Sequence, residues 1–179
     1  MTKEQTTIDS AQILDRAPTL CALLEHIAST DHLYLWEKLP RLVELASDVR
    51  TSPIGNHPFA MEVLDLFYQL HSTLEAHSRK EDDIVFPLIR ELLGANSVLA
   101  TQGAALAEYL KELEYEHRQL RGILESLDRV SHHYHPESHA PSSFTSLLYA
   151  LCALHVELLK HMDEEDHLLL PCLARLEKA

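Results

Sequence analysis

Apolar residues recur with helical spacing along four stretches of this chain. The pattern predicts helices over about residues 18–45, 58–93, 102–131 and 144–177, with polar connections at about 48–57 and 131–143. Pro40 and Pro87 are expected to bend or interrupt two of these helices, whereas Pro58 stands near the start of one. Four long helices with short connections predict an all-α fold, an up-down-up-down four-helix bundle.

One phrase of the second predicted helix returns in the fourth, 84 residues later. The two copies share their leucines, two histidines and an acidic pair, and a proline follows each copy at the same offset. They read Leu70-His71-x-x-Leu74-x-x-His77-x-x-x-Glu81-Asp82 with Pro87, and Leu154-His155-x-x-Leu158-x-x-His161-x-x-x-Glu165-Asp166 with Pro171.

Each copy places a His and a Glu four residues apart. Four residues turn a helix by about 400°, so both side chains lie on one face and can hold a single metal ion. Apolar residues surround both pairs on their helices: Leu66, Leu70, Leu74, Ile84 and Leu88 in the first copy, and Leu154, Leu158, Leu168 and Cys172 in the second. A carboxylate in such a stripe is costly unless it is compensated. A single copy would be equally consistent with an exposed, solvated face, but two matched copies favour a metal site.

His117 and His32 lie on the apolar stripes of the third and first predicted helices. A lone His there is usually a hydrogen-bonded core residue, but beside the two repeated pairs both become candidate ligands. The predicted site comprises four imidazoles and two carboxylates: His32, His77, Glu81, His117, His161 and Glu165. This donor set suits iron best, with manganese and zinc as alternatives. Shared carboxylates would bridge two metals and leave a position for solvent or a small gas.

The other histidines have weaker patterns. His71 and His155 lie about 120° from the predicted ligand direction, which indicates packing or support of the ligands. Those at 132, 133, 135 and 139 crowd one connection and are read as solvated, and His26, His57 and His167 follow no pattern.

Composition narrows the class of protein. The 179 residues suffice for one domain, with residues 1–17 as a polar arm and residues 18–179 as the bundle. A net charge of -13 argues against nucleic acid and anionic membranes as partners, and no apolar run approaches a membrane span. The three cysteines, Cys21, Cys152 and Cys172, form no close pair and are read as small buried hydrophobes in a reducing compartment, which predicts a cytoplasmic location.

From about Leu24 to Leu176 the chain resembles a hemerythrin-like, or HHE cation-binding, domain and, within that superfamily, the di-iron domain of the RIC (repair of iron centres) proteins. The resemblance is carried by Ile27 to His32 before Leu39-Pro40, by His77-x-x-Lys80-Glu81 before Phe86-Pro87, by Glu116-His117, and by His161-x-x-x-Glu165 before Leu170-Pro171. It implies histidine ligands at 32, 77, 117 and 161 and bridging carboxylates at Glu81 and Glu165.

The resemblance also implies a cofactor of two non-haem Fe ions with an oxo or hydroxo bridge. The implied role is a response to nitric oxide or oxidative stress, or repair of iron centres, with NO or O2 as the small ligand and a homodimer left open. The alternatives are reversible oxygen binding or sensing, and a metal-free structural bundle.

Two departures from the family pattern matter. RIC proteins usually carry an N-terminal domain with paired cysteines, and residues 1–17 hold none. Oxygen-carrying hemerythrins have a further His four residues after the third-helix ligand, where this chain has Arg121.

Overall fold

The structure is a computed structural model that describes residues 19–94, 100–171 and 173. The predicted arm at residues 1–17 lies outside this range. Residues 19–26 are helical and continue into η1 (Ile27–His32) and α2 (Leu33–Thr51), and η2 (Pro53–Asn56) is a short connection. The second long helix comprises α3 (Pro58–Lys80), η3 (Glu81–Val85) and α4 (Phe86–Gly94). The third is α5 (Ala100–Val130), and the fourth joins α6 (Ser142–Glu164) to η4 (Glu165–Leu169).

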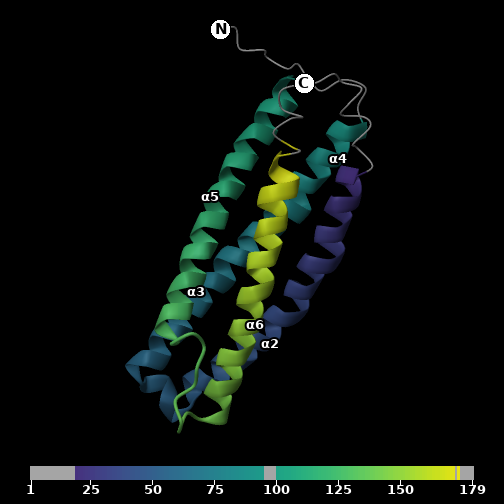
Figure 1. Cartoon of the computed structure of the whole chain (residues 1–179). Helices are drawn as coiled ribbons and strands as arrows, with labels where there is room; N and C mark the ends of the chain where they lie inside the picture. Colours follow the sequence, from purple (N-terminus) through teal and green to yellow (C-terminus); the bar gives the residue numbers. More distant parts are fainter. Residues whose placement is uncertain (1–18, 95–99, 172, 174–179) are drawn as a thin grey trace.

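These helices form a long bundle in which α3 packs mainly against α5, and α2 against α6 (Figure 1). Successive long helices run in opposite directions, and the connection between α5 and α6 closes one end (Figure 1). The described residues contain no strand, so the all-α bundle prediction is confirmed.

Three turns of π-helix, which the sequence pattern did not predict, interrupt the long helices. In η3 the Phe86 N–H donates to the Glu81 carbonyl, and in η4 the Leu170 N–H donates to the Glu165 carbonyl, five residues back in each case. Pro87 or Pro171 follows directly. A proline has no N–H with which to close an α-helical turn, and at these two places a wider turn lies just before it. Pro40 inside α2 has no such turn, and η1 has no proline directly after it. The repeated phrase therefore repeats a backbone distortion as well as a set of side chains.

Each π turn moves the buried face of its helix by one residue. The prediction that Ile84 and Leu168 face the core is wrong, because they are 45% and 51% exposed. Val85 and Leu169, one position later, are fully buried instead. The side chain of Cys172, which was predicted to lie on the same stripe, is outside the described residues.

Further boundaries differ from the prediction. Pro40 does not interrupt α2, which continues to Thr51. Pro40 is on the exposed side, where water can hydrate the carbonyl that it leaves free. The start at Pro58 is confirmed, with His57 as the N-cap. Gly55 in η2 is required sterically, since a Cβ there would lie 2.5 Å from the carbonyl oxygens of Val49 and Arg50.

The cysteine prediction is partly wrong. Cys21 is exposed and Cys152 is half-buried, and both are free thiols. Neither therefore behaves as a fully buried hydrophobe.

The core consists of two apolar clusters. One is built from α2, α3, the second half of α5 and α6, and includes Leu35, Leu74, Leu120 and Leu158. The other is built from the helical stretch before η1, α4, the first half of α5 and the end of the fourth helix, and includes Ile27, Val85, Leu113 and Leu169. On each long helix, the predicted site residues lie between the residue named for one cluster and the residue named for the other. The six site residues therefore form a polar layer that divides the core.

The fourth helix is long and apolar in composition. By length and hydropathy the segment Ser142–Leu169 could cross a membrane, which the sequence reading had not recognised. In the bundle its apolar face is covered, with Leu147, Leu151 and Leu158 fully or almost fully buried. Length and composition alone are weak evidence for a span, because the core helix of a bundle meets the same criteria.

Candidate metal centre

All six predicted site residues converge inside the bundle. His32 comes from η1, His77 from α3, Glu81 from η3, His117 from α5, His161 from α6 and Glu165 from η4. Each is at most 3% exposed, and they account for most of the buried polar residues in the described chain. Six ionisable groups at this depth need compensation from one another or from bound cations.

The six residues form two overlapping groups. His32 and His161 make one group with Glu81 and Glu165, and His77 and His117 make the other with the same two glutamates. Within each group, one ligand atom per residue lies within 4.8 Å of all the others. We call the place between His32 and His161 position 1 and the place between His77 and His117 position 2. The shared glutamates lie between the two positions.

The Nε2 atoms of the four rings point toward these glutamates. Glu81 Oε2 lies 3.2 Å from Nε2 of His32 and 3.4 Å from Nε2 of His77. Glu165 Oε2 lies 3.0 Å from Nε2 of His117 and 3.6 Å from Nε2 of His161. The rings of each position also pack edge to face, with centroids 5.2 Å apart in position 1 and 4.9 Å apart in position 2.

These inward atoms have no hydrogen-bond partner. The four Nε2 atoms and both carboxylate oxygens of Glu81 and of Glu165 are buried and make no hydrogen bond with any described residue. Leaving so many buried acceptors unpaired would be costly. Imidazole nitrogen and carboxylate oxygen suit first-row transition metals, and buried histidine–carboxylate sets bind iron, manganese or zinc. The residues present therefore fit a pair of metal ions.

The outer face of each ring meets another carboxylate. The Nδ1 atom lies 2.7 Å from Asp82 Oδ1 in His32, 3.0 Å from Glu116 Oε2 in His77, and 2.7 Å from Asp166 Oδ1 in His117. His161 Nδ1 lies 3.7 Å from Asp31 Oδ2, which is beyond a hydrogen bond. We call Asp31, Asp82, Glu116 and Asp166 the outer carboxylates. A carboxylate can only accept at Nδ1, which leaves the lone pair of Nε2 for a metal.

Each outer carboxylate is next in the sequence to a predicted ligand of its own helix, but the histidine that it faces belongs to another helix. Asp82 follows Glu81, Asp166 follows Glu165, Glu116 precedes His117, and Asp31 precedes His32. Each long helix thus supplies a ligand, and the second, third and fourth also hydrogen-bond a histidine of another helix. Sequence reasoning missed this role, although Asp82 and Asp166 stood in the repeated phrase as a signal.

The pKa values of the metal-free site reflect this pairing. Burial lowers the pKa of His32, but the nearby carboxylates of Asp82 and Glu81 outweigh that effect and raise the pKa to about 10. Burial also lowers the pKa of His117, but the carboxylates of Glu165 and Asp166 outweigh that effect and raise the pKa to about 9. Burial raises the pKa of Glu165, but His161 and His117 outweigh it and hold the pKa well below its usual range. Protons thus stabilise the metal-free centre, and a metal ion has to displace them.

Other histidines lie elsewhere. His57 is exposed at the start of α3, about 30 Å along the helix from His77 at 1.5 Å per residue. His155 binds the Tyr134 hydroxyl through Nδ1 at 2.7 Å, and His71 packs near Phe67, which agrees with the packing role predicted for both. In the connection after α5, His132 stacks on Phe59 and His133 contacts Asp128.

The sequence reading assigned no role to His26. In the structure His26, Asp31 and Glu164 form a third, partly exposed group close enough to share a cation. His26 Nε2 lies 3.7 Å from Glu164 Oε2, a distance that also fits an ordinary surface ion pair.

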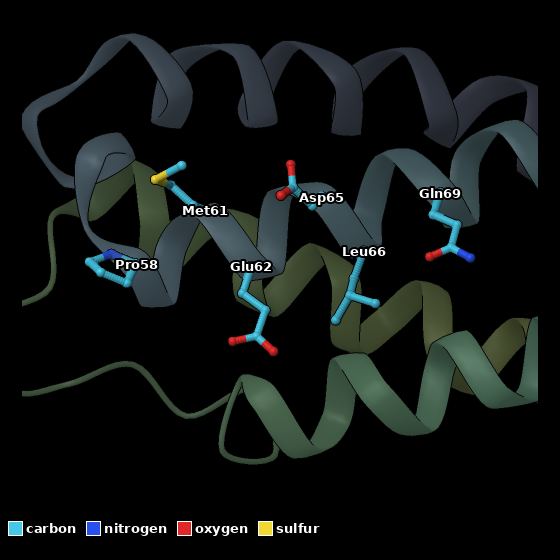
Figure 2. A pocket seen from close by; sticks show the side chains of 6 residues that line it. All are labelled: Pro58, Met61, Glu62, Asp65, Leu66 and Gln69. Atoms are coloured by element: carbon cyan, nitrogen blue, oxygen red, sulfur yellow. The ribbon is translucent and has the colours of Figure 1, made fainter.

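A surface hollow of about 600 Å³ is separate from this centre (Figure 2). All six side chains that line it come from the first half of α3, including Met61 and Leu66 (Figure 2). His77 is about 16 Å further along the helix from Leu66. The hollow therefore contributes nothing to the buried site.

Fold and site together define a helical-bundle protein whose buried histidines and carboxylates are arranged so that they could hold cations. Residues 23–173 match the hemerythrin HHE cation binding domain, and the chain belongs to that family.

Curated relatives include the iron-sulfur cluster repair protein ScdA of Staphylococcus haemolyticus, 25% identical over 83% of this chain and 64% of the relative. They also include the iron-sulfur cluster repair protein YtfE of Escherichia coli O81, 22% identical over 87% of this chain and 67% of the relative. A third is YtfE of Escherichia fergusonii, also 22% identical over 87% of this chain. The chain thus spans about two thirds of the length of these relatives.

Proposed function

We propose that this chain is a RIC-like di-iron protein that acts in the response to nitric oxide or oxidative stress by supporting the repair of iron centres. His32 and His161 would bind one iron, His77 and His117 the other, and Glu81 and Glu165 would bridge them. A non-haem iron pair supplies one-electron redox chemistry and a coordination position for a small ligand such as NO or O2.

One observation carries the proposal: two buried four-residue groups share both of their glutamates. A single metal would leave one pair of histidines without a partner in an apolar core. Two metals use every inward nitrogen and give each glutamate a bridging role. The outer carboxylates support this arrangement, because they hold the rings with Nε2 toward the glutamates.

The relatives support the biological role. Three similar proteins bear the name iron-sulfur cluster repair protein, and the similarity covers 83% to 87% of this chain. The same activity is proposed here for the bundle, as are a cytoplasmic location and a diatomic ligand.

The alternative role, reversible oxygen binding, has less support. Where an oxygen carrier is expected to have a fifth histidine, Arg121 instead bonds to Asp163 and Asp166. A cation cannot donate a lone pair to iron, so position 2 has fewer protein ligands than an oxygen carrier would provide.

The test is elemental analysis of untagged protein made with iron present. Two irons per chain are expected, and His77→Ala should reduce the content while the matched variant His71→Ala, one turn and a half away, should not. Iron-loaded protein should then restore a nitric-oxide-damaged [4Fe-4S] dehydratase faster than free ferrous iron does. Two irons without restoration would contradict the repair role and leave the di-iron assignment intact. No metal would favour a purely structural bundle.

A further inference from the structure

The two metal positions differ in their surroundings. At position 2 a cation holds each outer carboxylate. Lys80 Nζ donates to Glu116, the partner of His77, and also to Glu112 at 2.9 Å. Arg121 forms an ion pair with Asp166, the partner of His117, at 3.0 Å.

Position 1 has no such cations. Among the described residues, no Lys or Arg forms an ion pair with Asp82 or Asp31, the carboxylates that face His32 and His161. Within the described part of the chain, Asp82 forms its ion pair with His32 alone. His26 and Lys160 act on Asp31 only through space, and each forms its own ion pair with Glu164. Asp82 therefore accepts from His32 Nδ1 without a competing Lys or Arg, whereas Asp31 is too far from His161 Nδ1 to accept from it.

This asymmetry should alter metal affinity. A carboxylate that accepts from Nδ1–H makes the opposite nitrogen a stronger donor. A cation on that carboxylate draws its charge away and also repels a divalent ion directly. Both effects weaken His77 and His117 as ligands relative to His32, the position 1 histidine whose Nδ1 bonds to a carboxylate.

Access points in the same direction. A cavity of about 420 Å³ opens between α5 and the end of the fourth helix. His117 is the one predicted ligand that lines it, together with Glu114, Arg118, Arg121, Asp166, Leu170 and Pro171. Only the side chain of His117 would then separate water or a chelating group in this cavity from a metal at position 2.

We propose that the metal at position 2 is the exchangeable one, that Lys80 and Arg121 make it so, and that the cavity beside His117 is its route. The inference rests on the proposed di-iron function and deepens it, because it states which iron can be given up. Lys80 and Arg121 act through Glu116 and Asp166 and are positioning residues.

The experiment follows release of ferrous iron from anaerobically loaded protein into excess ferrozine by absorbance. The unaltered protein should release its iron in two phases of equal amplitude. Lys80→Gln should slow the fast phase by about tenfold, the lower end of what partners of metal-ligating histidines contribute. Damage to the fold would speed release, so a slower phase cannot arise from misfolding. Arg79→Gln is the matched control, since Arg79 is the next residue, is exposed and pairs with Glu75.

Two further variants separate the positions and the route. Asp82→Asn should speed the slow phase and leave the fast phase unchanged. Glu114→Trp, on the cavity wall, should slow only the fast phase, whereas Glu108→Trp, exposed elsewhere on α5, should have no effect.

The outcomes distinguish this inference from the function on which it rests. A single release phase from protein that holds two irons, or a fast phase that Lys80→Gln leaves unchanged or speeds, would overturn the inference alone. Fewer than two irons per chain before the chelator is added would overturn the proposed function and the inference with it.

Discussion

Asp82 Oδ1 lies 2.7 Å from Nδ1 of His32, a residue 50 positions earlier in the chain. Asp166 and His117 repeat this contact at the same distance, 49 positions apart. In both cases the Asp directly follows a buried Glu whose oxygens face the same histidine. An acidic pair in the sequence thus serves two purposes: its first member faces the site, and its second fixes the ring that completes it.

Substitution of the shared glutamates should reveal their role. Glu81→Gln keeps the size of the side chain but removes the charge that both positions share. We expect the iron content to fall from two per chain to one or fewer, with helicity unchanged by circular dichroism. Glu75→Gln, at a half-buried position six residues before Glu81, serves as the control. A variant that retains two tightly bound irons would contradict the bridging role.

Metal removal should destabilise the bundle. An ion that binds only the folded state stabilises it by about 2.7 kcal/mol when its free concentration is a hundred times Kd. Chelated protein should therefore unfold at a lower temperature than iron-loaded protein, and iron should restore the difference. Equal unfolding temperatures by calorimetry would show that the folded protein gains nothing from the metal.

The metal-free protein should lose stability as the solution becomes alkaline. The folded pKa values of His32 and His117, about 10 and about 9, exceed the ordinary value of 6.5. A raised pKa means that the folded state holds the proton more tightly, so this stabilisation is complete below pH 6.5. It declines above that pH and is lost once the pH passes the folded pKa values. Thermal unfolding of metal-free protein at pH 7 and pH 10 measures the loss, and His32→Gln should reduce it.

Neighbouring leucines test the register set by the π turn in η4. Leu169 is fully buried, so Leu169→Ala should cost about 2–5 kcal/mol of unfolding free energy. Leu168, which a regular helix would bury, is exposed, and Leu168→Ala should change stability by less than about 0.5 kcal/mol. Denaturant unfolding of the two variants compares their stabilities directly. A larger loss for Leu168→Ala than for Leu169→Ala would contradict the π turn and indicate a regular helix.

Local patterns in the sequence predicted the helices, their approximate limits and the six site residues that converge in the bundle. These follow from local rules: apolar residues every three or four positions predict a helix, and a buried carboxylate beside a histidine four residues away indicates compensation by a metal. The repeat of the phrase made the prediction specific. Pro87 and Pro171, at matched offsets, were a signal for the π turns that periodicity alone does not convey.

The tertiary structure decided everything that depends on more than one helix. It showed that Ile84 and Leu168 face outward, because each π turn adds a residue that a fixed 100° step cannot anticipate. It showed which helix supplies the outer carboxylate for each histidine, and that Lys80 and Arg121 hold two of the four. Such contacts join residues 36 to 130 positions apart, and their partners are set by how the helices pack against one another.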